Sequence, residues 1–321
     1  MKIGILGVGQ HGQIHLKCLK NLSNFEIVGF YDIDDQRSEK VSKDFGIKRY
    51  KNYLDLIDDS DVVSIITPTS SHYEYARAAI TRSRHVFVEK PLVDDIRQAE
   101  ELIKLAEEAE IKVQVGHVER FNQAFIAVEK HIDTVMFIES HRLSDFSTRG
   151  LDIPVVYDLM IHDIDIILGV VKSSIKRISA SGVPVISQTP DIANARIEFD
   201  NGAVANLTAS RISMKRMKKT RFFQSNAVIN VDFLNKKSEI IKKQNFIDDE
   251  DMIPHKTISL PNIPNISFTI YEPEISEINT IQTELEYFYD SIKNDKPPVV
   301  SIIDGYNALL VAQTILEKIE I

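Results

Sequence analysis

The sequence predicts an α/β protein in two parts. Residues 1–120 form a doubly wound parallel sheet, and residues 121–321 form an α+β domain with a large, mostly antiparallel open sheet. Two observations predict this division. Short segments rich in Val and Ile alternate with helical patterns in the first part, and apolar residues alternate with polar ones in the second. At 321 residues the chain is long enough to bury two hydrophobic cores.

The strand-like segments of the first part are almost entirely apolar, as expected for parallel strands that helices cover on both faces. They lie at residues 3–6, 26–31, 61–66, 86–88 and 112–115. The clearest helical pattern runs over residues 94–110, where apolar side chains recur on one face.

In the second part, alternation of apolar and polar residues indicates strands with one exposed face. Residues 193–199 and 203–211 are the clearest pair, and Asp200-Asn201-Gly202 between them is typical of a hairpin turn. Residues 246–275 are rich in proline and predict extended loop and edge strand. Other strands are expected at 134–141, 175–181, 221–224 and 228–233, and helices at 278–293 and 304–319, the last of which could pack back on the first domain.

Composition excludes several classes of protein. Lys and Arg number 38 against 47 Asp and Glu, and the net charge of −9 argues against nucleic-acid binding, which normally needs a basic surface. Cys18 is the only cysteine, so the chain forms no intramolecular disulfide. No apolar run approaches the roughly 18 to 20 residues of a membrane-spanning helix, and the N-terminal run is too short for a signal peptide. We expect a cytoplasmic protein without nucleic-acid or membrane partners.

A glycine-rich loop, Gly7-Val8-Gly9-Gln10-His11-Gly12, follows the first strand and opens a helix, and Asp32 ends the second strand. This spacing is the fingerprint of a dinucleotide-binding Rossmann domain. Its first glycine permits a tight turn, the second lets backbone amides approach the diphosphate, and the third lets helix and strand pack closely. A carboxylate at Asp32 accepts hydrogen bonds from the ribose and repels a 2′-phosphate. The sequence therefore favours NAD over NADP, although Arg37 could compensate.

Glu89-Lys90-Pro91 follows the strand at 86–88. Ligands of open α/β sheets bind beyond the carboxyl ends of the strands, so Lys90 should point toward the cofactor crevice. Other motifs follow neighbouring segments: Thr67-Pro68-Thr69-Ser70-Ser71-His72, then residues 116–121, then Asp158-Leu159-Met160-Ile161-His162. Together with the glycine loop, this set resembles the Gfo/Idh/MocA family of NAD(P)-dependent oxidoreductases over nearly the whole chain.

The resemblance implies a lysine close to the nicotinamide and the reacting hydroxyl, here Lys90, and an aspartate and a histidine on one helix of the second domain, here Asp158 and His162. Residues four apart share a helix face, so this pair can point at one substrate. Removing hydride from a secondary alcohol needs a base for the hydroxyl proton, and histidine titrates near neutral pH. We expect His162 to be the acid–base residue, Lys90 a polariser or alternative base, and Asp158 an orienting or substrate-binding carboxylate. The alternative for the pair is a solvated helix face that also bears Asp163 and Asp165.

The motif at 67–72 and the motif at 89–91 are also expected to contact the cofactor. The residues expected to do so are Thr67, Pro68, His72 and Glu89, beside Lys90. The nine histidines show no spacing typical of metal ligands apart from the Asp158 and His162 motif, so no metal is expected.

The segments at 116–122 and 140–150 resemble a subgroup of nucleotide-sugar dehydrogenases, which oxidise the C3 hydroxyl of a UDP-N-acetylhexosamine such as UDP-N-acetylglucosamine. A UDP-sugar needs cations for its diphosphate, and Arg120, Arg142 and Arg149 are the candidates. A second basic run at 211–221 is either a further set of ligands or a solvated strand connection.

Three alternatives remain open. The chain could be an inositol or polyol dehydrogenase, or it could use tightly held NAD to cleave a glycoside without net redox change. It could also be a non-catalytic sensor that binds a dinucleotide, although a sensor needs no acid–base pair. The family resemblance further implies a homodimer or homotetramer through the second domain.

Overall fold

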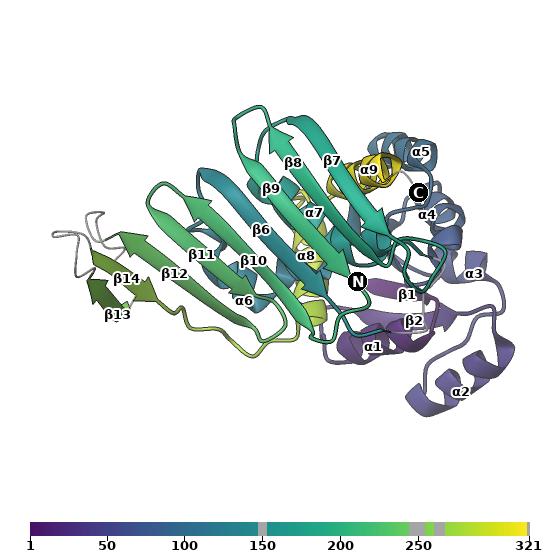
Figure 1. Cartoon of the computed structure of the whole chain (residues 1–321). Helices are drawn as coiled ribbons and strands as arrows, with labels where there is room; N and C mark the ends of the chain where they lie inside the picture. Colours follow the sequence, from purple (N-terminus) through teal and green to yellow (C-terminus); the bar gives the residue numbers. More distant parts are fainter. Residues whose placement is uncertain (147–152, 244–253, 260–266, 320–321) are drawn as a thin grey trace. The chain divides into compact units, whose positions relative to one another are not determined.

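The computed structural model describes residues 1–146, 153–243, 254–259 and 267–319 (Figure 1). The chain forms two compact units. Unit one is Met1–Val118 with Ile278–Leu309, and unit two is Glu119–Glu277 with Leu310–Ile321. The boundary lies two residues before the expected one, and residues 278–309 belong to unit one although the sequence-based division gave them to the second domain.

The sheet of unit one has five strands in the order β2-β1-β3-β4-β5, and every pair is parallel. The strands are β1 (Lys2–Leu6), β2 (Glu26–Tyr31), β3 (Val62–Ile65), β4 (His85–Glu89) and β5 (Val113–Gly116). Each was expected from its apolar run, and the predicted doubly wound parallel sheet is confirmed.

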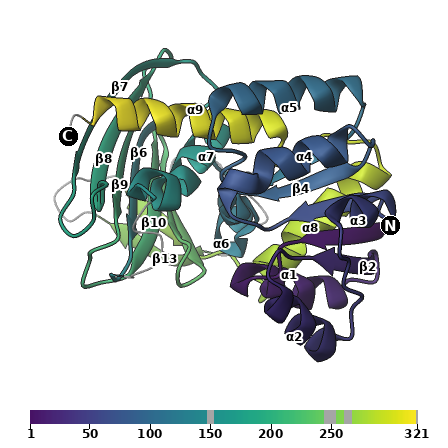
Figure 2. The ribbon, with the colours of Figure 1, turned by 90° about the vertical axis from the view of Figure 1, so that its right-hand side faces the viewer.

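Helices cover both faces of this sheet, which explains why its strands are apolar throughout. On one face lie α1 (Gln10–Lys20) and α8 (Thr280–Lys293), which contact each other and share a core with β1 through Leu16, Phe288 and Ile5. The contacts with α1 explain why α8 belongs to unit one. The other face carries α3 (Tyr53–Asp58), α4 (His72–Ile80) and α5 (Ile96–Glu108), and Figure 2 shows α4 and α5 side by side. At the start of α2 (Asp35–Phe45) and α5, Asp34 and Asp95 cap the helix with their side chains.

Unit two contains a nine-stranded sheet in the order β13-β14-β12-β11-β10-β6-β9-β8-β7. Only the β6–β9 pair is parallel within it. The strands are β6 (Val135–Leu143), β7 (Ile175–Val183), β8 (Ile192–Phe199), β9 (Val204–Ser210), β10 (Met217–Gln224), β11 (Ala227–Asp232), β12 (Lys237–Lys243), β13 (Pro254–Ser259) and β14 (Ser267–Tyr271). The large, mostly antiparallel sheet is confirmed, and the hairpin between β8 and β9 turns at Gly202, whose φ is +86°. Strand β12 was not expected from the sequence.

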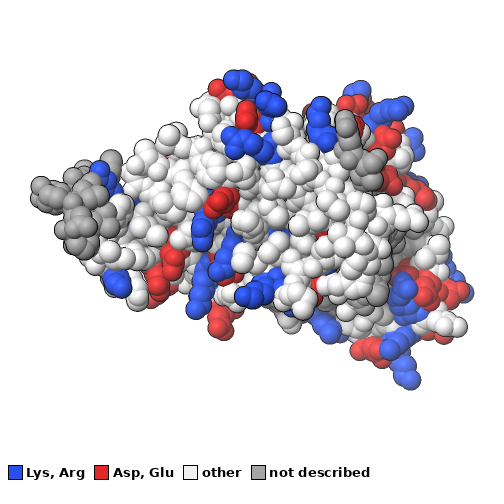
Figure 3. All heavy atoms as spheres, in the orientation of Figure 1, with Lys and Arg blue, Asp and Glu red and all other residues white. Residues whose placement is uncertain are grey.

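The two faces of this sheet differ. Helices α6 (Gln123–Glu129) and α7 (Ile161–Val170) contact one face through strands such as β11, β12 and β6. The opposite face is open and largely uncharged, with isolated ion pairs such as Arg221 with Glu139 (Figure 3). The unit boundary falls within α9 (Ile302–Lys318). Among the described residues, no helix is both long and apolar enough to span a membrane.

Candidate functional site

The loop between β1 and α1 is shaped by its three glycines. Gly7 has a φ of +89°, which favours glycine. A Cβ atom on Gly12 would lie 2.1 Å from the carbonyl oxygen of Gly7, so only glycine lets α1 begin this close to the turn. At Gly9, a Cβ atom would meet nothing within 4 Å apart from its chain neighbours. The open space at Gly9 and the amide groups of the first turn of α1 form a cradle that fits a diphosphate.

Asp32 lies beside this loop with its carboxylate fixed on both oxygens. The amide of Val8 donates to Oδ2 at 2.8 Å, and the amide of Asp34 donates to Oδ1 at 2.9 Å. The guanidinium of Arg37 lies 3.1 Å from the same carboxylate, and 42% of the Arg37 side chain is exposed. This placement fits the acidic residue that binds ribose hydroxyls in dinucleotide-binding folds.

His72, the first residue of α4, connects two of the expected cofactor segments. Strands β3 and β4 are neighbours in the sheet, so the loops at their carboxyl ends lie side by side. The His72 ring contacts the carbonyl oxygen of Thr67 through Nε2 at 2.9 Å and that of Pro91 through Nδ1 at 3.0 Å. Burial lowers the pKa of His72, and the ring is 1% exposed. His72, an expected cofactor contact, therefore links the Thr67 and Pro91 loops.

Glu89, at the end of β4, connects the glycine loop to the motif that carries Lys90. Its Oε1 lies 3.1 Å from Nε2 of His11 and 3.1 Å from Nε2 of His15, and its Oε2 accepts a hydrogen bond from the Lys90 amide at 3.3 Å. Burial by itself would raise the pKa of Glu89, but the hydrogen bonds from the two histidines outweigh this and lower it. The hydrogen bond to Glu89 raises the pKa of His11. An ionised carboxylate therefore sits between the two imidazoles.

His15 was not among the residues expected from the sequence. The signal was present, because His11 and His15 are four residues apart on the helix that the glycine loop opens. Lys90 is half-buried next to Glu89, and its peptide bond with Pro91 is cis. Unit one thus assembles Gly7, Gly9, Gly12, Asp32, Glu89 and Lys90 along the carboxyl ends of β1, β2 and β4.

In unit two, Asp158 and His162 lie on consecutive turns, but not on one regular α-helix. Val156–Met160 forms a π-helical turn that carries Asp158, and α7 begins at Ile161, one residue before His162. A single α-helix had been expected. Single π-helical turns within helices occur often at functional sites, because they change the direction of the side chains they carry. Both side chains are half-buried.

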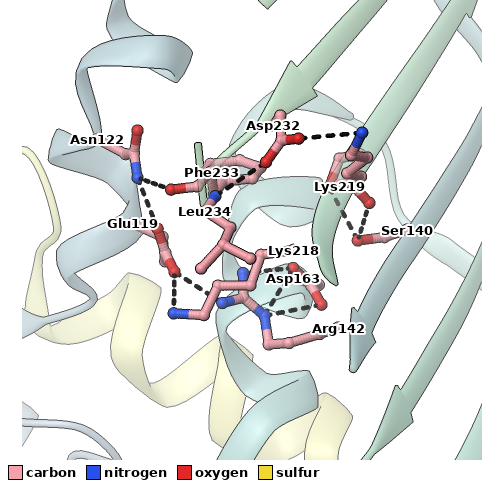
Figure 4. A network of polar contacts seen from close by, with 11 residues as sticks. Glu119, Asn122, Ser140, Arg142, Asp163, Lys218, Lys219, Asp232, Phe233 and Leu234 are labelled. Carbon is pink, nitrogen blue, oxygen red and sulfur yellow. Dashed lines mark hydrogen bonds and ion pairs between the residues drawn. The ribbon is translucent and has the colours of Figure 1, made fainter. Parts of the chain in front are cut away.

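Arg142, one of the arginines expected to bind the diphosphate, is fully buried in a charge cluster. Its Nε and Nη2 atoms donate to Asp163 at 2.7 to 3.1 Å, and its Nη1 donates to Glu119 at 2.7 Å (Figure 4). Lys218 lies 3.3 Å from the same oxygen of Glu119. Burial would raise the pKa of Glu119, but the nearby cations Arg142 and Lys218 outweigh it and keep the pKa low. Two cations and two carboxylates balance, so the cluster has no net charge.

Arg120, another arginine expected to bind the diphosphate, is also held in an ion pair. Its guanidinium donates to the carboxylate of Asp165 at 2.7 and 3.1 Å, and 9% of its side chain is exposed. Asp163 and Asp165 are both buried, and each pairs with an arginine. These two aspartates therefore do not form the solvated helix face that was the alternative. Arg149 lies outside the described residues.

The basic run at 211–221 is mostly paired as well. Arg211 is buried near Asp191, Lys218 pairs with Glu119, Lys219 with Asp232 and Arg221 with Glu139. Lys215 and Arg216 are exposed, so these two are the cations of the run that remain candidates for an anionic substrate.

Comparison with known proteins agrees with this arrangement. Residues 1–117 match an oxidoreductase family with an NAD-binding Rossmann fold, and residues 128–229 match the GFO/IDH/MocA C-terminal domain. The UDP-N-acetylglucosamine 3-dehydrogenase of Acidithiobacillus ferrooxidans is 28% identical over 321 residues, which cover 100% of this chain and 97% of that protein. A solved structure with that name is similar at a TM-score of 0.89, over 99% of this chain and 97% of the other. The scyllo-inositol 2-dehydrogenase (NAD(+)) of Bacillus subtilis is 26% identical, over 95% of this chain and 90% of its own length.

Proposed function

Because the chain belongs to the Gfo/Idh/MocA family of NAD-binding oxidoreductases, we propose that it oxidises a secondary hydroxyl of a sugar, at C3 of a UDP-N-acetylhexosamine. The observation that supports this substrate is the similarity to a UDP-N-acetylglucosamine 3-dehydrogenase, which extends over both units almost without truncation. An inositol or polyol dehydrogenase is the second candidate, supported by the similarity to scyllo-inositol 2-dehydrogenase.

The cofactor in this proposal is NAD. The amides at the start of α1 and the open side of Gly9 would hold its diphosphate, and Asp32 would accept hydrogen bonds from its ribose. The Asp32 carboxylate would repel a 2′-phosphate, which supports NAD over NADP. When bound, NAD supplies the nicotinamide that accepts hydride from the substrate carbon.

The residues of the chain handle the hydroxyl proton. His162 accepts it as the hydroxyl carbon becomes a ketone, and Asp158, one turn earlier, orients the substrate. Lys90 is proposed to polarise a substrate hydroxyl, and Glu89 positions Lys90 by accepting the hydrogen bond from its amide. With Arg120 and Arg142 in ion pairs, Lys215 and Arg216 are the candidate partners for the substrate diphosphate.

The test is absorbance at 340 nm with NAD and, in turn, UDP-N-acetylglucosamine, UDP-N-acetylglucosaminuronate, myo-inositol and scyllo-inositol. We expect turnover with a UDP-sugar, a kcat lowered about 10² to 10⁴-fold in His162→Gln and Lys90→Met, and no change in His255→Gln. His255 is a suitable control because it is an exposed histidine on β13. Turnover with an inositol alone would favour the second candidate, and equal losses in the control would remove the roles given to His162 and Lys90.

We also propose that the protein forms homodimers or homotetramers through the open face of the unit-two sheet. That face is largely uncharged (Figure 3), and it carries the half-buried cross-strand pair Phe137 and Phe223, on the same side of the sheet as the Arg221–Glu139 ion pair. Light scattering should give a mass of two or four times 36.5 kDa, and Phe137→Glu should lower it. A 36.5 kDa species at micromolar concentration would contradict this.

A further inference from the structure

Three side chains meet in unit one in an arrangement that suits a metal ion. They are His11, His15 and Glu89, and one ligand atom from each lies within 4.8 Å of the others. The histidines come from the first two turns of α1, and the glutamate comes from the end of β4. The sequence alone did not predict this group, because Glu89 is 78 residues from His11 and is brought there by the parallel sheet.

Two of the three separations between ligand atoms are close to those of a tetrahedral site. Ligand atoms about 2.1 Å from a zinc ion lie about 3.4 Å from one another. Here Oε1 of Glu89 lies 3.1 Å from Nε2 of each histidine, so an ion could enter between them after small movements. The ring centroids of His11 and His15 are 5.0 Å apart, with the rings inclined at 62°, so they do not stack against each other.

The surroundings hold two of the three ligands in place. The ring of His15 is 0% exposed and packs against Phe87, with 5.5 Å between ring centroids. Oε2 of Glu89 accepts the Lys90 amide, and its carboxylate lies over Gly116, where a Cβ atom would meet it at 3.0 Å. His11, in contrast, has 53% of its side chain exposed. The group is therefore rigid on one side and open to solvent on the other, which leaves a position for entry and for a water ligand.

We propose that His11, His15 and Glu89 bind a divalent transition-metal ion, with Zn²⁺ as the best match. Two imidazoles and one carboxylate are the ligand set of open zinc sites, whereas Mg²⁺ and Ca²⁺ prefer oxygen ligands. The site requires no substrate and no dinucleotide, so its test is independent of the proposed function.

The experiment is a calorimetric titration of the purified, tag-free protein with ZnCl₂, supported by the visible spectrum of the Co²⁺ form. We expect one Zn²⁺ per chain, and Co²⁺ bands of the intensity typical of a tetrahedral ion. His11→Gln and Glu89→Gln should each weaken binding at least about 10-fold. The thermal midpoint of His11→Gln should stay close to that of the wild type, because its side chain is exposed.

The matched control is His255→Gln. His255 is 58% exposed and lies 3.6 Å from a single carboxylate, Glu272, so it is an exposed His–Glu pair without a second histidine. The His255→Gln variant should bind Zn²⁺ as the wild type does. Absence of stoichiometric binding, or equal weakening in His11→Gln and His255→Gln, would overturn the proposal. A MgCl₂ titration should give no binding to these residues, and Mg²⁺ binding that His11→Gln abolishes would also contradict the assigned ion class.

Discussion

The guanidinium of Arg142 binds both carboxylate oxygens of Asp163, at 2.7 to 3.1 Å, in the interior of unit two. Arg142 comes from β6 and Asp163 from α7, so the pair fastens the helix that carries His162 to the sheet. A buried ion pair of this kind adds little net stability compared with apolar residues, but removing one partner leaves the other charge buried and uncompensated.

Replacing Arg142 should therefore cost much more than replacing an exposed arginine. We expect Arg142→Met to lower the free energy of unfolding by about 3 to 5 kcal/mol, measured by urea denaturation at pH 7. Arg196→Met is the control, since Arg196 pairs with Glu198 on the exposed face and has 45% of its side chain exposed; its cost should stay below about 1 kcal/mol. Adding Asp163→Asn to Arg142→Met should recover part of the loss. Equal costs for the two arginines would contradict the structural role of the cluster.

Substitutions at two glycines of the loop before α1 should affect stability and NAD binding differently. A Cβ atom on Gly9 has free space, so Gly9→Ala should change the free energy of unfolding by less than about 1 kcal/mol. It should nevertheless raise the Kd for NAD at least about 10-fold, because the methyl group would occupy the space in which we place the diphosphate. Gly12→Ala forces a contact with the Gly7 carbonyl. It should therefore lower the free energy of unfolding by about 1 to 3 kcal/mol in addition to weakening NAD binding. Calorimetric NAD titrations and urea denaturation measure both effects, and unchanged NAD affinity in Gly9→Ala would refute this placement.

Asp32 and Arg37 should set the preference between the two nicotinamide cofactors. Asp32→Asn removes the charge that binds the ribose hydroxyls and repels a 2′-phosphate, so kcat/KM for NAD should fall about 10 to 100-fold while that for NADP falls less. Arg37→Gln removes the cation beside the same carboxylate and should lower kcat/KM for NADP more than for NAD. For each protein, kcat/KM for NAD and kcat/KM for NADP are measured from the absorbance at 340 nm with the same substrate, and their ratio is compared. A NAD/NADP ratio that neither variant changes would show that specificity arises elsewhere.

The fold could be predicted largely from the sequence, because the two parts of the chain use different hydrophobic periods. The strands of unit one are mostly buried and mostly apolar, whereas β8 and β9 alternate around the turn at Gly202. Strand β12, Lys237–Lys243, was missed because lysines at both ends mask a short alternation in which only Ser238 and Ile240 are buried.

The candidate site could be predicted only in part. Local spacing predicted the glycine loop and Asp32, whereas Lys90 was predicted only together with the other motifs. The partners of Arg142 and Arg120 could not be identified in the same way, because a charged residue looks the same in sequence whether it binds an anion or pairs with a buried carboxylate. Asp163 and Asp165 lie on an apolar helix, and that context was the available hint that they are buried.

His72 should make the protein less stable as the pH falls below about 6.5. Burial lowers the pKa of His72 in the folded protein, and its contacts with the carbonyls of Thr67 and Pro91 and the charge of Glu89 offset this only in part. In the unfolded chain the pKa of histidine is about 6.5. Below that pH the unfolded state takes up a proton that folded His72 does not bind, so the stability contributed by neutral His72 is complete above pH 6.5 and declines as the pH falls toward the folded-state pKa.

His72→Gln isolates this contribution. At pH 7 the variant should be about 1 to 3 kcal/mol less stable than the wild type, because the hydrogen bonding of buried carbonyls is disturbed. The difference between the two proteins should shrink as urea denaturation is repeated at pH 6 and pH 5, since the wild type alone loses the contribution of this histidine. His85, whose pKa burial also lowers, changes both proteins equally and cancels in the difference. A difference that stays constant or grows as the pH falls would show that His72 is not held neutral in the folded protein.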